Sequence, residues 1–215
     1  MTDVEFDTAL VSAAFSLGAE EGWRGVSPAA AARRAGLDLA AARQRYSGTL
    51  GILCAFGRLA DAHALTGTLV EGPVRERLFD ILMRRFDFLQ MHRAGVLALL
   101  RALPTEPPLA LCLGRATITS MGWMLEGAGV STRGLRGEIR KKGLTLVWGY
   151  GMRAWMRDDS TDLTATMAAV DKALERADAL AARFHPRTAP QAHGSAPEAA
   201  DEPGSPLPDD PAGVI

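Results

Sequence analysis

The chain has 215 residues, of which 47% are hydrophobic and 23% are charged, and its formal net charge is −1. This composition is that of a globular protein and excludes wholesale disorder, and the lack of any run of about 18 uninterrupted apolar residues excludes a transmembrane segment. The N-terminus, MTDVEFDTAL, has neither the basic start nor the apolar core of a secretory signal, so we expect a cytoplasmic protein.

Apolar residues recur every three or four positions, and Ala, Leu and Arg dominate, which predicts an all-α fold of about nine helices. The first helix is expected at 4–20 and ends before Gly22. Ser27 and Pro28 are typical of an N-cap followed by a first-turn proline, so a short helix should cover 28–35, with Gly36 as its left-handed C-cap. Asp38 can cap a third, short helix that reaches Tyr46.

Longer helices follow. One is expected at 49–65, the next is opened by Pro73, and others are expected at 92–103, at 107–127 and from 131 or 132 to about 157. The acidic segment 158–162 predicts a cap and an acidic first turn for a last helix that ends at 184. Cys54 and Cys112 lie in apolar surroundings, and we interpret both as reduced core residues.

The end of the chain differs in composition from the rest. Residues 186–215 hold one basic residue, Arg187, and five acidic ones, so this segment carries −4 and the remaining chain carries +3. Pro, Gly, Ala and acidic residues without apolar periodicity cannot bury enough surface to offset the entropy of ordering. We therefore expect a disordered tail.

Two short helices separated by Gly36, placed between a first helix and a long one, are typical of a helix-turn-helix. The segment AAAARRAGLDLAAARQRYSGTLGIL resembles the N-terminal domain of the TetR family of bacterial transcriptional regulators. The motifs that carry the resemblance cover about the first 65 residues, and the rest of the chain is similar only in length and helix count. These motifs are Glu21-Gly22-Trp23, Ala35-Gly36-Leu37, Tyr46 and Ile52-Leu53.

The resemblance implies a helix-turn-helix head at 1–48, a ligand-binding and dimerisation body at 49–185, and the tail at 186–215. It also implies a homodimer that binds palindromic half-sites of operator DNA in the major groove. We expect no cofactor and no metal, because the four histidines and two cysteines share no ligand spacing. No catalytic motif occurs, so we do not expect an enzyme.

Between Gly22 and Ala60 six arginines face one acid, a local charge of +5 that suits DNA. Asp3, Glu5 and Asp7, however, stand where the family has a basic residue, and with Glu20 and Glu21 they place −5 beside this patch. The alternative is that the arginines form a solvated face or pair with these acids. The residues expected at DNA are Arg33, Arg34, Arg43, Gln44, Arg45, Tyr46 and Thr49.

Methionine and aromatic side chains gather in the middle and end of the body, which favours a pocket for an apolar small molecule or lipid effector. The alternative is that they are core or dimer interface. The candidate pocket residues are Met83, Phe86, Met121, Met124, Trp148, Met152 and Trp155.

Glycines and apolar residues of the last two helices favour close packing in an intersubunit four-helix bundle. The alternative is that these faces pack on each other within one subunit. The candidate dimer residues are Gly143, Val147, Gly151, Leu163, Met167, Val170 and Leu174.

The body also resembles the lipid-binding accessory proteins of ubiquinone biosynthesis, which keep a TetR-type fold without DNA binding. This resemblance rests on Gly22-Trp23 and on the stretch from Trp148 through Trp155 to Leu163. It implies a carrier of lipid or quinone. The amphipathic helix that would contact a membrane is missing after Phe184.

Overall fold

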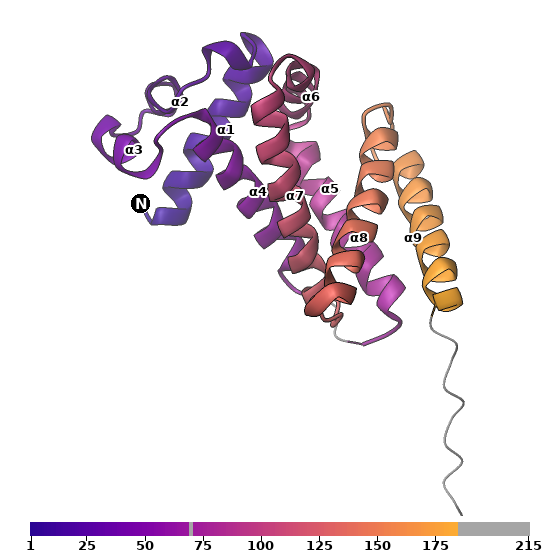
Figure 1. Cartoon of the computed structure of the whole chain (residues 1–215). Coiled ribbons are helices and arrows are strands. Elements are labelled where there is room, and N and C mark those ends of the chain that lie inside the picture. The colour runs from indigo at the N-terminus through magenta and orange to yellow at the C-terminus, as the bar shows by residue number, and fades with distance from the viewer. Residues whose placement is uncertain (69–70, 185–215) are drawn as a thin grey trace, which may run out of the picture.

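The structure, a computed structural model, describes residues 1–68 and 71–184. Within these two ranges it has nine α-helices and no strand, which confirms the predicted all-α fold. Figure 1 shows a small group of helices at the N-terminal end, attached to a longer bundle. The tail that we expected to be disordered lies outside the described residues.

The N-terminal group, which we call the head, consists of α1 (Asp3–Glu20), α2 (Pro28–Ala35) and α3 (Leu39–Arg45). Its short helices begin and end as the sequence predicts. The hydroxyl of Ser27 accepts from the backbone N–H of Ala30, and the carboxylate of Asp38 accepts from that of Ala41 at 2.8 Å. Gly36 has a φ of +65°, so a residue without a side chain ends α2 without strain.

The remaining helices form the body, and they agree with the predicted ranges to within a few residues. They are α4 (Thr49–Leu65), α5 (Val74–Met91), α6 (Arg93–Ala102), α7 (Pro107–Gly127), α8 (Gly134–Trp155) and α9 (Thr164–Phe184). Two short 3-10 turns complete the described elements: η1 (Trp23–Gly25) lies between α1 and α2, and η2 (Leu103–Thr105) lies between α6 and α7. In Figure 1, α8 and α9 form a hairpin on the side of the body away from the head.

The segment before α9 corrects one prediction. Asp158 and Asp162 lie before the helix and not in its first turn, which contains no acid. The Asp158 carboxylate is buried and accepts from both the backbone N–H and the hydroxyl of Thr166 at 2.7 Å. Although burial acts to raise its pKa, hydrogen bonds from Ser160 and Thr166 lower the pKa of Asp158 to about 2.

Head and body share one hydrophobic core. The ring of Phe15 on α1 stacks on that of Phe56 on α4, with centroids 3.9 Å apart. The indole N–H of Trp23 donates to the carbonyl of Gly95 on α6 at 3.0 Å. Because these contacts join the head directly to α4 and α6, a movement of these two helices would also shift α1.

A second buried charged side chain, besides Asp158, lies between the body helices. The guanidinium of Arg85 on α5 pairs with the Asp61 carboxylate of α4 and lies 5.1 Å from the ring centre of Trp148. The hydroxyl of Ser120 on α7 donates to Asp61 at 2.6 Å. Burial lowers the pKa of Arg85 to about 10. This cluster ties three helices together through polar contacts.

The two cysteines are free, as expected, but they are not both in the core. Cys54 is half-buried and Cys112 is exposed. The interpretation of Cys112 as a core residue was therefore wrong. Its position on the solvent side of α7 could not be seen in the local sequence, because apolar neighbours on a helix point in several directions.

Candidate nucleic-acid interface

The proposed recognition helix α3 lies at the end of the head that is remote from α8 and α9 (Figure 1). Arg43 and Gln44 both project into solvent from it, and neither side chain has a hydrogen-bond or ion-pair partner in the part of the chain that the structure describes. Gly36 ends α2 in a left-handed conformation, and Asp38 caps the first turn of α3. These two side chains are therefore available to base edges or phosphates.

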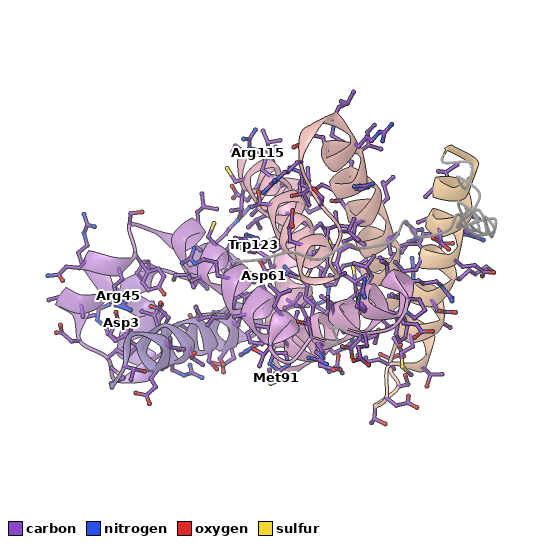
Figure 2. All side chains as sticks on the ribbon, turned by 90° about the horizontal axis from the view of Figure 1, so that it is seen from below. Asp3, Arg45, Asp61, Met91, Arg115 and Trp123 are labelled. Carbon is purple, nitrogen blue, oxygen red and sulfur yellow. The ribbon has the colours of Figure 1, made fainter. Side chains whose placement is uncertain are left out.

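Arg45 is in a different position. Its guanidinium donates to the carboxylates of Asp3 and Asp7, at 3.0 and 3.1 Å, and its side chain is 27% exposed. It also lies 5.3 Å from the ring centre of Phe6. Figure 2 shows Asp3 and Arg45 together on the head. The hydrogen bond to Asp7 raises the pKa of Arg45, which therefore stays protonated, and the carboxylates of Asp3 and Asp7 balance its charge.

Tyr46 and Thr49 use their hydroxyls inside the head. The phenol of Tyr46, which is buried, donates to Asp7 at 2.6 Å. Burial is the larger cause, and this hydrogen bond the smaller one, of a raised pKa of Tyr46. The hydroxyl of Thr49 donates to the carbonyl of Val26 at 2.8 Å. Both residues therefore hold the ends of α3 and α4 in place, and their contact with DNA stays a prediction.

The positive patch between Gly22 and Ala60, which extends from the head onto α4, contains paired and unpaired arginines. Arg34 binds Glu20 through two hydrogen bonds of 2.6 and 2.9 Å, which lower the pKa of Glu20. Carboxylates of α1 thus neutralise Arg34 and Arg45. The patch keeps four arginines without a carboxylate partner among the described residues. These are Arg24, Arg33, Arg43 and Arg58.

The side chains predicted to line a ligand pocket form part of the core. Phe86, Met121, Met124 and Trp155 are fully buried, and the ring of Phe86 stacks on Trp148 with centroids 4.4 Å apart. Met83 and Met152 are half-buried and pack against that core, so this region is closed.

Two hollows in the described surface lie elsewhere. One of about 280 Å³ lies between the end of α5 and the loop before α9, and the other, of about 270 Å³, lies between α1 and α6. Both touch the exposed side chain of Met91, which Figure 2 labels. Neither is lined by a residue of the predicted pocket, so that pocket stays a prediction.

Most residues predicted for a dimer interface pack within one chain. A side chain at Gly151 would lie 2.8 Å from Val170 on α9 and 2.9 Å from Phe86 on α5. Val147, Leu163, Val170 and Leu174 are buried and Met167 is half-buried, whereas Gly143 alone has open space beside it. These contacts fit the intramolecular alternative, and a role of these residues in a dimer stays a prediction.

The outer face of α8 is a feature that sequence reasoning missed. Leu135, Ile139, Leu146 and Tyr150 are exposed large apolar side chains on this helix, and Leu180 is exposed on α9. Their spacing of four, seven and four residues along α8 was the signal that could have revealed a second apolar stripe. A row of large apolar side chains on α8 is therefore left uncovered within one chain.

Within the two described ranges, no group of three or more His, Cys, Asp or Glu side chains is placed to hold a metal ion. In the same ranges no helix combines the length and apolar character needed to cross a membrane.

Comparison with solved structures identifies the fold. No known family profile and no curated protein sequence matches this chain. A TetR transcriptional regulator from Nitrosomonas europaea superposes with a TM-score of 0.65 at 21% identity, covering 81% of this chain and 98% of that one. A TetR-family regulator from Streptomyces coelicolor gives 0.57 at 19% identity, with 86% of this chain and 85% of that one covered.

A third match, to a TetR-family regulator from a Rhodococcus species, has a TM-score of 0.55 at 18% identity and covers 80% of this chain and 98% of the other. The chain is therefore a helix-turn-helix head joined to a helical body. More particularly, it has the fold of the TetR-family transcriptional regulators. At these identities the likeness concerns the fold.

Proposed function

We propose that the protein is a TetR-type transcriptional regulator that binds operator DNA in the major groove with α3. The observation that carries this proposal is the pair of exposed, unpartnered side chains, Arg43 and Gln44, on a helix whose N-terminus is capped by Asp38 and which lies at the tip of the head. Arginine contacts guanine and glutamine contacts adenine through paired hydrogen bonds.

The charge distribution assigns different roles to the arginines. Arg24, Arg33 and Arg58 have no carboxylate partner among the described residues, so they are available to phosphates beside the groove. Arg45, held by Asp3 and Asp7, sets the angle between α1 and α3. We therefore place direct base contact at Arg43 and Gln44 and give Arg45 a positioning role.

Palindromic operators require two heads. We propose that a second copy of the chain packs on α8 from Gly143 onwards, where Leu146 and Tyr150 are exposed and Gly143 and Gly149 leave open space. Leu180 extends this apolar surface onto α9. Small residues let two helices approach closely, and the apolar side chains supply the buried area.

We further propose that an apolar or amphipathic small molecule regulates the distance between the heads. The methionines and aromatic rings around Phe86 and Trp148 can repack around such a ligand. A ligand that favours one arrangement of α4 to α8 would be felt at α1 through the contacts of Trp23 and Phe15.

Selection of DNA from a random library with the full chain, at about 0.1 M salt, tests the proposed function. We expect an enriched palindromic sequence. Arg43→Ala should then weaken specific binding by at least about tenfold, whereas Arg115→Ala, a control at an exposed arginine of α7 labelled in Figure 2, should not change it. No enrichment of any sequence would contradict the proposal.

A carrier of lipid or quinone is the second candidate function, and the contacts of Arg45 with Asp3 and Asp7 favour it, because acids that cover a recognition helix oppose DNA binding. Mass spectrometry of the purified full chain distinguishes the two. Bound isoprenoid lipid without an enriched DNA sequence would support the carrier. An enriched palindrome without lipid would support the regulator.

A further inference from the structure

The N-terminal half of α8 carries a dense group of cations. Residues 133–142 hold five basic residues and one acid, Glu138, which gives a local charge of +4. Glu138 is already paired with Lys141 at 2.6 Å, and the carboxylate of Glu126, whose pKa is lowered by hydrogen bonds from Thr132, lies near Arg133. Three cations remain without a carboxylate partner among the described residues. They are Arg136, Arg140 and Lys142.

These cations border an apolar strip. The side chains of Leu135 and Ile139 lie between them on the outer side of the helix and are 79% and 62% exposed. At 100° per residue, Arg136 and Arg140 project on one side of this strip and Lys142 on the other. We call this surface, formed by Leu135, Arg136, Ile139, Arg140 and Lys142, the cationic face of α8. It fits a partner that alternates acidic and apolar groups.

The chain itself contains such a segment. After Phe184 it continues for 31 residues, and two acidic pairs, Asp201-Glu202 and Asp209-Asp210, stand on either side of Leu207. Counting Arg187 and Glu198, residues 186–215 carry −4, which matches the +4 of residues 133–142. The tail and the face are therefore complementary in charge, and Leu207 supplies a large apolar side chain between the two acidic pairs.

The geometry allows the two to meet. Figure 1 shows that the end of α9 and the start of α8 lie at the same end of the body, opposite the head. Thirteen residues lie between Phe184 and Glu198, and an extended chain over the fourteen steps that join the two spans up to about 46 Å. The whole of α8 has 22 residues, or a length of about 33 Å. The acidic segment can thus reach any part of the cationic face.

We infer that residues 198–210 of the chain bind the cationic face of α8 in the same molecule. The acids pair with Arg136, Arg140 and Lys142, and Leu207 covers the exposed strip at Leu135 and Ile139. Covalent linkage gives the tail a high local concentration at this face, so weak contacts suffice. A tail bound in this way keeps polyanions off the body and leaves the arginines of the head as the surface that attracts nucleic acid.

Zero-length cross-linking with a carbodiimide tests this inference, because it joins a lysine amine to a carboxylate in contact with it. The sequence has three lysines, Lys141, Lys142 and Lys172. Lys142 belongs to the cationic face, and Lys172 is exposed on α9 and serves as the internal reference. At about 20 mM salt we expect tail cross-links to Lys142 to exceed those to Lys172 about fivefold, and at about 500 mM salt, where exposed charges are screened, to approach them.

Cross-linking to Lys142 could also be frequent simply because Lys142 lies close to the end of α9, where the tail begins. Variants that leave this distance unchanged are therefore needed. Arg136→Gln combined with Arg140→Gln should reduce the Lys142 cross-link at least about threefold, because two of the three free cations are lost. Arg153→Gln, at an exposed arginine in the other half of α8, is the matched control and should leave the yield unchanged.

Three results would overturn the inference. If the yield of tail cross-links to Lys142 is the same at both salt concentrations and in the Arg136→Gln, Arg140→Gln variant, then tethering alone brings the tail near. Cross-links found only between chains, in a mixture of isotopically light and heavy protein, would place the tail on a partner. If the full chain shows no tail cross-link but binds vesicles with anionic lipid in an Arg136- and Arg140-dependent way, the face is a membrane site.

Discussion

Two arginines of α3 that are two residues apart differ in what they contact. Arg43 is exposed without a partner, whereas Arg45 binds Asp3 and Asp7. We expect Arg43→Ala to weaken binding to a selected operator by about 1–3 kcal/mol and to leave the melting temperature unchanged. Arg45→Ala should instead lower the melting temperature, because it removes the ion pairs with Asp3 and Asp7. Fluorescence anisotropy and thermal unfolding measure the two effects.

The comparison is informative in both directions. If Arg45→Ala weakens operator binding as strongly as Arg43→Ala does, then DNA displaces Asp3 and Asp7, and the ion pairs seen here belong to the free protein. Freeing Arg45 by Asp3→Asn and Asp7→Asn gives the converse test. It should steepen the salt dependence of DNA binding by about one phosphate contact if Arg45 then reaches the backbone.

At the scale of single residues, the sequence predicted what depends on near neighbours. The roles of Ser27, Gly36 and Asp38 follow from residues up to three positions away, and all three predictions are confirmed. The pairing of Arg45 with Asp7 joins residues 38 positions apart. Such a contact depends on the angle between α1 and α3, which packing of the whole head decides, so the sequence could only raise it as an alternative.

At the scale of elements, the contact of α6 with α1 depends on a glycine. A side chain at Gly95 would place its Cβ 2.4 Å from the carbonyl oxygen of Phe15, and backbone cannot move aside easily. We expect Gly95→Ala to lower the free energy of unfolding by about 1–3 kcal/mol. Indole fluorescence should change as well, because Trp23 donates to the carbonyl of Gly95.

A glycine in α4 is the matched control for this substitution. Nothing lies within 4 Å of a Cβ built on Gly57. Gly57→Ala should therefore stabilise the protein by about 0.5–1 kcal/mol through helix propensity alone. If Gly95→Ala stabilises the fold as Gly57→Ala does, then α1 and α6 do not pack closely enough at Gly95 to exclude a side chain.

The turn before α9 predicts a dependence on pH. The pKa of Asp158 is about 2 in the fold, below its ordinary value of 3.8. Its stabilising effect is thus complete above about pH 4 and is lost as the pH falls towards 2. We expect Asp158→Asn to lower the free energy of unfolding by about 1–2 kcal/mol at pH 7 and by much less near pH 2. Denaturant unfolding at both pH values measures this.

Asp159→Asn is the control for Asp158→Asn. The Asp159 side chain is 99% exposed and lies 3.7 Å from Arg93. Its substitution should change stability by less than about 0.5 kcal/mol at any pH. A loss of stability in Asp158→Asn that is the same at pH 2 and pH 7 would mean that the turn depends on side-chain shape and not on the carboxylate charge.

At the scale of the whole molecule, the sequence predicted the number and order of helices because each helix has its own caps and apolar period. It did not predict which face of α8 is covered. Val147 and Gly151 are four residues apart on α8, as are Leu146 and Tyr150, and none of the four is charged. The first pair nevertheless packs inside the chain, whereas the second faces solvent. Periodicity identifies stripes, and the rotation of a helix in the bundle decides which stripe is buried.

The outer stripe of α8 gives the last prediction. Leu146 is 77% exposed, so Leu146→Glu should leave the fold of one chain intact, whereas a buried unpaired carboxylate in a dimer interface is costly. Light scattering after size exclusion should give twice 22.9 kDa for the unmodified chain and 22.9 kDa for the variant. Leu111→Glu on α7, 69% exposed in the chain, is the control and should remain dimeric.

The same variant connects the body to the head. A palindromic site offers two half-sites, and a monomer gains the contacts of only one. Leu146→Glu should therefore reduce affinity for a palindrome by at least about tenfold and leave affinity for an isolated half-site unchanged, since linked binding multiplies the two contacts. If Leu111→Glu becomes monomeric and Leu146→Glu does not, the second copy packs on α7, and the heads would be spaced by a different surface.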